Sequence, residues 1–412
     1  MSKWNRKIWA AILVVGMTAS LTACGGSKGE NSNASAAGTQ NETATVQDES
    51  ADSNTDSTGS TTSLVQDNRV LQIPDDNYRT YYELFVYSFY DSDGDGIGDL
   101  QGVLEKLDYL NDGDDTTDMD LGINGIWLMP VMPSVTYHKY DTTDYENIDP
   151  QYGTLETFQE LLTACHDRGI RVILDLAMNH SSSSHPWFQQ AAEYLKSLPE
   201  GAEPDSSECP YMDYYHFSRE YQGGYAQLDG TAWYYEARFW DGMPDLNLEN
   251  ETVRREFEQI ADFWLDMGVD GFRLDAVKEY VTGSTEGNVE ILSWFADYVH
   301  GKDPENYLVC ECWTDQNTYA KYYESGVDSM FDFAFADKSG IIANVMNGKA
   351  SATSYAKNLE TEQGMYAQYN PDYINAPFYT NHDMGRSAGY YAGENSEAQT
   401  KMGNALNLSF AI

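Results

Sequence analysis

The sequence predicts an α/β fold, a (β/α)8 TIM barrel, because strand and helix signals alternate from about residue 80 onward. Amphipathic helical stretches such as Leu155–Asp167, Glu251–Met267 and Asn288–His300 separate short apolar runs. Such runs are typical of buried parallel strands. The predicted strands are Glu83–Phe89, Gly125–Met129, Arg171–Leu176, Gly271–Leu274, Tyr307–Cys310, Met330–Phe333 and Ala376–Tyr379.

Two departures from regular alternation set the predicted domain organisation. Residues 181–247, between the third and fourth strands, are too many for one helix, so we expect a small inserted domain there. Seven strands are evident, and a helical segment ending in Leu406–Ile412 follows the seventh. We therefore expect residues 69–180 and 248–412 to form the two parts of a catalytic barrel. Its eighth strand is expected to be lost by truncation at the C-terminus, or replaced by an unusual closing element.

Residues 1–24 resemble a lipoprotein signal peptide. Basic residues precede an apolar stretch, Ile8–Ala19, that is too short to span a membrane comfortably. The segment Leu21–Cys24 then resembles the lipobox of bacterial lipoproteins, in which the cysteine becomes the lipidated N-terminus. The alternative is an ordinary cleaved signal peptide followed by a chance cysteine.

Residues 25–68 are almost all small and polar, which predicts a flexible tether. Together with the lipobox, this tether predicts an extracellular protein anchored to the bacterial cell membrane through lipid on Cys24. The lipid anchor is the one membrane contact that we expect.

The charge of the chain limits its partners. Asp and Glu total 66 against 24 Lys and Arg, a formal net charge of -42. Such a chain repels phosphate backbones and anionic membrane surfaces, which argues against nucleic-acid binding. The charge is compatible with a neutral polymer such as a polysaccharide, or with bound cations.

Four acidic residues fall at predicted strand ends: Asp175, Asp275, Glu311 and Asp383. A single acidic residue after a strand is usually a helix cap or a turn former. Four of them are expected to converge, because the C-terminal ends of parallel barrel strands lie on one rim. Active sites of such barrels lie on that rim. Paired carboxylates suit glycosidic bond cleavage, and the alternative use of an acidic cluster is a hard metal ion.

Four segments in order along the chain resemble the conserved regions of glycoside hydrolase family 13, the α-amylase family. The segments are Asp175–His180, Gly271–Lys278, Cys310–Trp313 and Phe378–Asp383. The resemblance extends from about Tyr81 to Arg386. It implies a retaining glycoside hydrolase that cleaves α-1,4-glucosidic bonds of starch or maltooligosaccharides.

The resemblance assigns a separate role to each of three carboxylates. Asp275 would be the nucleophile, Glu311 the general acid and then base, and Asp383 the residue that grips the sugar hydroxyls in the transition state. A retaining mechanism predicts that the nucleophile and acid/base carboxyls lie roughly 5–5.5 Å apart.

The same resemblance implies further substrate-binding residues. Arg273 precedes Asp275 by two residues on the same strand face, where its fixed cation would keep Asp275 ionised. The remaining residues of this set are a sugar-stacking tyrosine and its neighbour, two histidines at the cleavage subsite and a lysine on the leaving-group side: Tyr140, Asp141, His180, His382 and Lys278.

The loop after the first predicted strand has the spacing of a cation site. Acidic residues stand at its first, third, fifth and ninth positions and glycine at its sixth, which suits Ca²⁺. The predicted ligands are Asp91, Asp93, Asp95, the Ile97 carbonyl and Asp99. Position 12 is Gly102 where an EF-hand has Glu, and the alternative is a solvated acidic turn. The expected role of the Ca²⁺ is structural.

The branch of the family is indicated by Met243–Asn247, which resembles a motif intermediate between oligo-1,6-glucosidases and neopullulanases. That branch includes lipid-anchored α-amylases. An α-1,6-glucosidase or a glucanotransferase of the same family remains an alternative, as does a non-catalytic glucan-binding lipoprotein. The three intact carboxylates favour an enzyme, because binding alone requires no acid and nucleophile together.

Overall fold

The computed structural model describes residues 71 and 73–408, which belong to one structural unit, Gln66–Ile412. The predicted signal peptide, Cys24 and the predicted tether of residues 25–68 lie outside the described residues. Among the residues that are described, no helix is long and apolar enough to cross a membrane.

The centre of the fold is a seven-stranded parallel sheet in the order β1-β2-β3-β7-β8-β9-β10. The strands are β1 Tyr81–Leu84, β2 Gly125–Leu128, β3 Arg171–Leu176, β7 Gly271–Leu274, β8 Tyr307–Cys310, β9 Ser329–Asp332 and β10 Ile374–Pro377. The order follows the chain, as in a TIM barrel. The structure therefore confirms the predicted α/β class, and β3, β7 and β8 have the predicted bounds.

The first strand differs from its prediction over Glu83–Phe89. Strand β1 ends at Leu84, and a helical turn, α2 Val86–Phe89, follows it. The Ser88 amide donates to the Phe85 carbonyl at 3.2 Å, which closes this turn. A short apolar run fits a buried strand and a buried helical turn equally well, so its periodicity could not decide between them.

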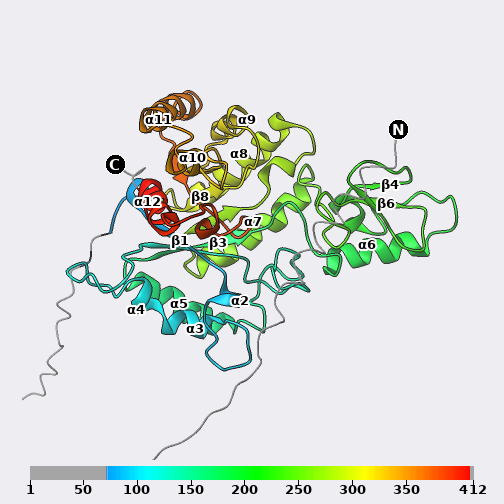
Figure 1. The fold of residues 1–412 in the computed structure, drawn as a ribbon. Helices are drawn as coiled ribbons and strands as arrows, with labels where there is room; N and C mark the ends of the chain where they lie inside the picture. Colours follow the sequence, from blue (N-terminus) through cyan, green and yellow to red (C-terminus); the bar gives the residue numbers. More distant parts are fainter. Residues whose placement is uncertain (1–70, 72, 409–412) are drawn as a thin grey trace, which may run out of the picture. The chain divides into compact units, whose positions relative to one another are not determined.

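Helices alternate with the strands and cover them. Helices α3 Leu100–Glu105 and α5 Leu155–His166 lie on one side of the labelled strands in Figure 1, and α8 Thr285–Lys302 and α9 Gln316–Ala320 on the other. The other described helices beside the large sheet are α4 Leu107–Leu110, α7 Glu251–Asp266, α10 Ile341–Met346, α11 Ala352–Tyr366 and α12 Ser396–Leu408.

The helix starts follow from capping side chains. Thr154, Asn250 and Ser284 cap α5, α7 and α8 by accepting a backbone N–H of the first turn. Helix α7 buries a stripe at helical spacing, and the indole of its Trp264 donates to the Tyr145 carbonyl at 2.8 Å. Local sequence therefore determines where these helices begin and which face they bury.

Between β3 and β7 the chain forms a separate small antiparallel sheet, in the order β4-β6-β5. Its strands are β4 Phe217–Ser218, β5 Tyr225–Gln227 and β6 Tyr234–Glu236, and α6 Pro186–Ser197 precedes them. Figure 1 shows β4, β6 and α6 together, away from α11. An insertion after the third strand was predicted, and the pairing of His180 with Asp245 joins it to the end of β3.

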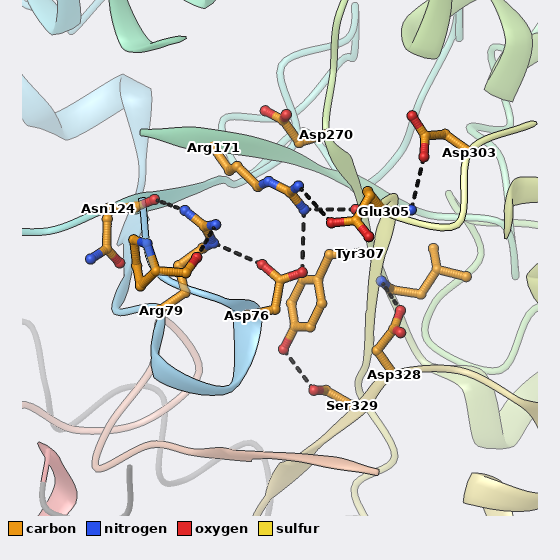
Figure 2. A network of polar contacts seen from close by, with 12 residues as sticks. Asp76, Arg79, Asn124, Arg171, Asp270, Asp303, Glu305, Tyr307, Asp328 and Ser329 are labelled. Carbon is orange, nitrogen blue, oxygen red and sulfur yellow. Dashed lines mark hydrogen bonds and ion pairs between the residues drawn. The ribbon is translucent and has the colours of Figure 1, made fainter. Parts of the chain in front are cut away.

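A polar network ties together the N-terminal ends of several strands (Figure 2). The Asp76 carboxylate accepts from Arg79 at 2.8 Å and from Arg171, the first residue of β3, at 3.2 Å. Arg79 also donates to the Asn124 carbonyl just before β2, and Arg171 to the Glu305 carbonyl before β8. This end of a barrel usually serves stability, which leaves the opposite end for chemistry.

A buried pair of carboxyl groups joins the end of β9 to α11. Asp332 ends β9 and accepts from Tyr319 at 2.9 Å and from Asn375 at 3.0 Å, while Glu362 on α11 accepts from Gln316. Both residues are almost fully buried, at 0% and 1% exposure. Burial, and then the charge of Asp332, raise the pKa of Glu362, so this carboxyl holds a proton at neutral pH.

Replacement of Glu362 by glutamine is expected to change how stability depends on pH. The folded protein keeps a proton on Glu362 that the unfolded chain releases near its ordinary pKa of 4.5. Stability from this proton is therefore present below that pH and declines as pH rises, by up to about 1.4 kcal/mol per pH unit. Urea unfolding of Glu362→Gln between pH 5 and 9 should give a flatter profile than wild type, whereas the exposed Glu360→Gln should not. Parallel profiles for all three proteins would contradict the expectation.

Candidate active site

The centre of the candidate site is the guanidinium of Arg273, which is fully buried on β7. Its Nη1 donates to Asp175 Oδ1 at 2.8 Å and to Asp275 Oδ1 at 2.6 Å, and its Nη2 donates to Glu311. These acceptors come from the ends of three neighbouring strands, β3, β7 and β8. The structure thus brings together Arg273 and two of the three predicted catalytic carboxylates.

Backbone hydrogen bonds fix the chain just after β7 and β8, where Asp275 and Glu311 lie. The Glu311 amide donates to the Leu274 carbonyl at 2.9 Å, and the Val277 amide donates to the Glu311 carbonyl at 3.0 Å. Ala276 has a φ of 48°, in the left-handed region. This tight turn after Asp275 ends the strand and begins the short helix η3, Val277–Glu279.

The environment of Glu311 favours its protonated form. Burial is the largest cause, and the charges of Asp275 and Asp383 add to it, while Arg273 opposes them; the pKa is raised to about 8. Burial also raises the pKa of Asp175, to about 6, which leaves it ionised at neutral pH. A carboxylic acid that keeps its proton at pH 7 beside other carboxylates can act as a general acid.

Tyr140 and His382 lie next to these carboxylates and stack on each other. The Tyr140 hydroxyl donates to Asp175 Oδ2 at 2.8 Å, and its ring stacks on His382 with centroids 5.6 Å apart. His382 Nε2 lies 3.3 Å from Asp383 Oδ2, and the Asp383 side chain is 51% exposed. Asp383 is therefore the most open of the predicted catalytic residues, which suits contact with an incoming ligand.

Two predicted substrate-binding residues are buried with unused polar atoms. His180 is completely buried, its Nε2 has no partner among the described residues, and burial lowers its pKa. Asp141 accepts from the hydroxyls of Ser134 and Thr136 through Oδ1, while its buried Oδ2 has no partner in the described part of the chain. Buried polar atoms usually have partners, so these atoms are suited to meet a ligand or water.

Lys278 lies apart from this cluster. It is on η3, its side chain is 41% exposed, and its ammonium lies 3.5 Å from Glu279. The structure places it on the rim, just beyond Asp275 in the chain.

A family model described as the α-amylase catalytic domain matches residues 83–411. The chain belongs to the α-amylase family.

The chain is similar to curated α-amylases and to solved structures of related proteins. Alpha-amylase 3 of Dictyoglomus thermophilum is 41% identical over 319 residues, which cover 76% of this chain and 58% of that protein. The structure of Amy13B from Eubacterium rectale matches with a TM-score of 0.78 at 55% identity, covering 82% of this chain and 65% of the other. An α-amylase from H. orenii matches with a TM-score of 0.65 at 40% identity, covering 79% of this chain and 64% of the other. This chain thus spans less than two thirds of the length of these relatives.

The acidic loop of this α-amylase family member gathers three of its predicted metal ligands. One carboxylate oxygen each from Asp91, Asp93 and Asp99 lies within 4.8 Å of the others. The Asp95 carboxylate is not part of this group and accepts from the Ile97 amide at 2.7 Å. Three carboxylates at this spacing fit a metal ion, and oxygen ligands of this kind suit hard divalent cations.

Trp127 and Glu83 were not identified as site residues from the sequence, and Asp175 was assigned no role there. The Trp127 indole donates to Asp175 Oδ2 at 3.1 Å, and its ring lies under Arg273, 5.0 Å from the guanidinium. Asp175 thereby links Trp127, Tyr140 and Arg273. Glu83 Oε1 lies 2.6 Å from His382 Nδ1. The sequence did contain a signal for Glu83, because a carboxylate between Tyr82 and Leu84 in a buried strand needs a polar partner.

Proposed function

We propose that this protein is a retaining glycoside hydrolase of the α-amylase type, which cleaves α-1,4-glucosidic bonds in starch or maltooligosaccharides. The observation that carries the proposal is the convergence of Asp275 and Glu311 on the single guanidinium of Arg273. Burial raises the pKa of Glu311 to about 8, which favours its protonated form at neutral pH. A retaining glycosidase needs one carboxyl that attacks and one that gives up a proton. Similarity to Alpha-amylase 3 over 76% of this chain and to the H. orenii α-amylase over 79% supports the same reaction.

The reaction would proceed in two displacements. Asp275 attacks the anomeric carbon while Glu311 donates its proton to the departing glycosidic oxygen, which leaves a covalent glycosyl ester on Asp275. Glu311, now a carboxylate, takes a proton from water, and that water displaces Asp275 and releases the sugar. Arg273 holds both carboxyls in place throughout, and the exposed carboxylate of Asp383 accepts hydrogen bonds from the sugar hydroxyls.

Activity on starch is expected to depend on both carboxyls and on pH. Reducing-sugar release from soluble starch should disappear in Asp275→Ala and fall at least about 1,000-fold in Glu311→Gln, whereas Glu360→Gln on α11 should match wild type. Because Glu311 must be protonated, and its pKa is raised to about 8, the rate should fall as pH rises through that value.

The reaction products distinguish an α-amylase from a glucanotransferase, an α-1,6-glucosidase and a non-catalytic glucan-binding protein. Maltoheptaose should give shorter maltooligosaccharides, initially as the α-anomer by NMR, and isomaltose should remain intact. Products longer than maltoheptaose would indicate a glucanotransferase, and cleavage of isomaltose an α-1,6-glucosidase. Starch hydrolysis no greater than that of Asp275→Ala would indicate a glucan-binding protein and would overturn the proposal.

We also propose that the acidic loop binds a structural Ca²⁺ through the grouped carboxylates of Asp91, Asp93 and Asp99. The loop follows α2 and leads into α3, whose first turn is capped by Asp99. The Asp91 carboxylate already orders the loop by accepting from the Gly94 and Gly96 amides. A bound cation would offset the repulsion between the three carboxylates and stabilise the segment that follows β1.

Calcium is expected to raise the thermal stability of the protein through this loop. Saturation at about 100 times the dissociation constant adds about 2.7 kcal/mol to the free energy of unfolding. Differential scanning calorimetry should show a higher melting temperature with CaCl₂ than with EDTA. Asp93→Asn should remove most of this increase, and the exposed Asp372→Asn should retain it. An equal Ca²⁺ effect in all three proteins would place the ion elsewhere.

For localisation, we propose lipid attachment at Cys24 and display on the outer surface of the cell, as in lipid-anchored amylases of the intermediate branch. The support is the lipobox-like Leu21–Cys24 segment followed by a polar stretch. Expressed in a bacterial host, the protein should incorporate labelled palmitate and sediment with membranes. Cys24→Ser should do neither, and Cys165→Ser, at a buried cysteine, should behave like wild type. Palmitate-free wild type would refute the anchor.

A further inference from the structure

His382 lies between a carboxylate and a phenol. Its Nδ1 is 2.6 Å from Glu83 Oε1 on β1, and its Nε2 is 3.1 Å from the Tyr140 hydroxyl. The side chains of His382 and Glu83 are 16% and 22% exposed, so both contacts are largely shielded from water. The ring is held by stacking on Tyr140, and it meets Trp127 edge to face.

The hydrogen bonds on the Tyr140 side require a proton on Nε2. Tyr140 has one hydroxyl proton, which it donates to Asp175 Oδ2 at 2.8 Å. Asp175 accepts from Arg273 and Trp127 as well, as an ionised carboxylate does. The Tyr140 oxygen is therefore an acceptor toward His382, and Nε2 must be the donor.

The other side of the ring requires a proton on Nδ1. An ionised carboxylate can only accept, so the 2.6 Å contact with Glu83 needs an N–H at Nδ1. The backbone amide of His382 also points at the same Glu83 oxygen, at 3.4 Å. A neutral imidazole has one N–H and cannot satisfy both neighbours, whereas an imidazolium can.

We propose that Glu83 is a positioning residue that holds His382 as an imidazolium, so that the cleavage site has a second fixed cation besides Arg273. The proposal rests on the glycosidase function proposed above. Glu83 touches neither of the predicted reacting carboxyls, and it acts through the orientation and charge of His382.

The charged groups that face His382 favour this state on balance. Burial alone would lower the pKa of His382, and Arg273 on β7 acts in the same direction. The hydrogen bond and charge of Glu83, with a smaller contribution from Asp383, outweigh them and raise the pKa. His138, in the loop after β2, also faces this region, and burial lowers its own pKa, so it adds little positive charge at neutral pH.

The cation would act on the most open part of the site. His382 Nε2 lies 3.3 Å from Asp383 Oδ2, so an imidazolium there attracts the exposed Asp383 carboxylate and partly offsets its charge. Asp383 can then accept hydrogen bonds from a sugar with less repulsion from the nearby Asp275 carboxyl. Loss of the cation should therefore weaken binding in the transition state.

The first test measures the pKa of His382 without reference to activity. In full-length protein labelled with [¹³Cε1]-histidine, His382→Asn identifies the His382 NMR signal. Wild-type His382 should titrate above the ordinary value of 6.5. Glu83→Gln, which keeps an acceptor but removes the charge, should lower the midpoint by about one unit or more. A wild-type midpoint below the ordinary value, or equal midpoints in the two proteins, would overturn the proposal.

The second test measures kcat/KM for maltoheptaose between pH 5 and 9. At pH 5 the imidazole is protonated with or without Glu83, so Glu83→Gln should approach the wild-type value. At pH 8 the variant should be about tenfold lower. Glu83→Ala, which also frees the ring, should be impaired at every pH, and Glu360→Gln should follow wild type. A constant ratio of Glu83→Gln to wild type across the range would show a purely structural role. Absence of wild-type activity would refute the proposed function, while the NMR titration would still decide the state of His382.

Discussion

The buried guanidinium of Arg273 imposes the main constraint on this site. A permanent charge with no exposed surface costs several kcal/mol in lost hydration unless neighbouring groups compensate it. Here Asp175 and Asp275 face the guanidinium as acceptors from two strand ends, and Glu311 supplies a further hydrogen-bond acceptor from a third. The Trp127 and Tyr140 rings lie against the guanidinium. Because each partner is on a different strand, the charge can be satisfied only when β3, β7 and β8 are in register. The same contacts that stabilise the fold thus position the proposed chemistry.

A chain of polar contacts extends outward from that cation through Asp175 and Tyr140 to His382 and Glu83. The Tyr140 hydroxyl donates to Asp175, and the two ring nitrogens of His382 lie 3.1 Å from the Tyr140 hydroxyl and 2.6 Å from Glu83 on the first strand. Burial, and then the charges of Asp275 and Asp383, raise the pKa of Glu311 against the opposing effect of Arg273, so Glu311 favours its protonated form. One carboxyl with a proton and another held by a guanidinium is the asymmetry that a two-step glycosidase needs.

Much of the fold could be predicted because strand periodicity and helix caps are local signals. The bounds of β3, β7 and β8 follow from runs such as Gly271–Leu274, where all four residues are buried. The prediction for the first strand was wrong because Val86–Phe89 is apolar and becomes a helical turn. The predicted calcium ligands follow from spacing, but only the folded loop separates Asp95 from the group formed by Asp91, Asp93 and Asp99.

The sequence by itself determined which chemical groups stand at the strand ends, because parallel strands in a barrel bring all their C-terminal ends to one rim. It thereby indicated Asp275, Glu311 and their neighbour Arg273. Only the tertiary structure decided how these groups pair. Glu83 and His382 are 299 residues apart, and Trp127 and Asp175 are 48 apart. No local pattern encodes such contacts, because they depend on the register and curvature that place side chains from distant strands within hydrogen-bond distance.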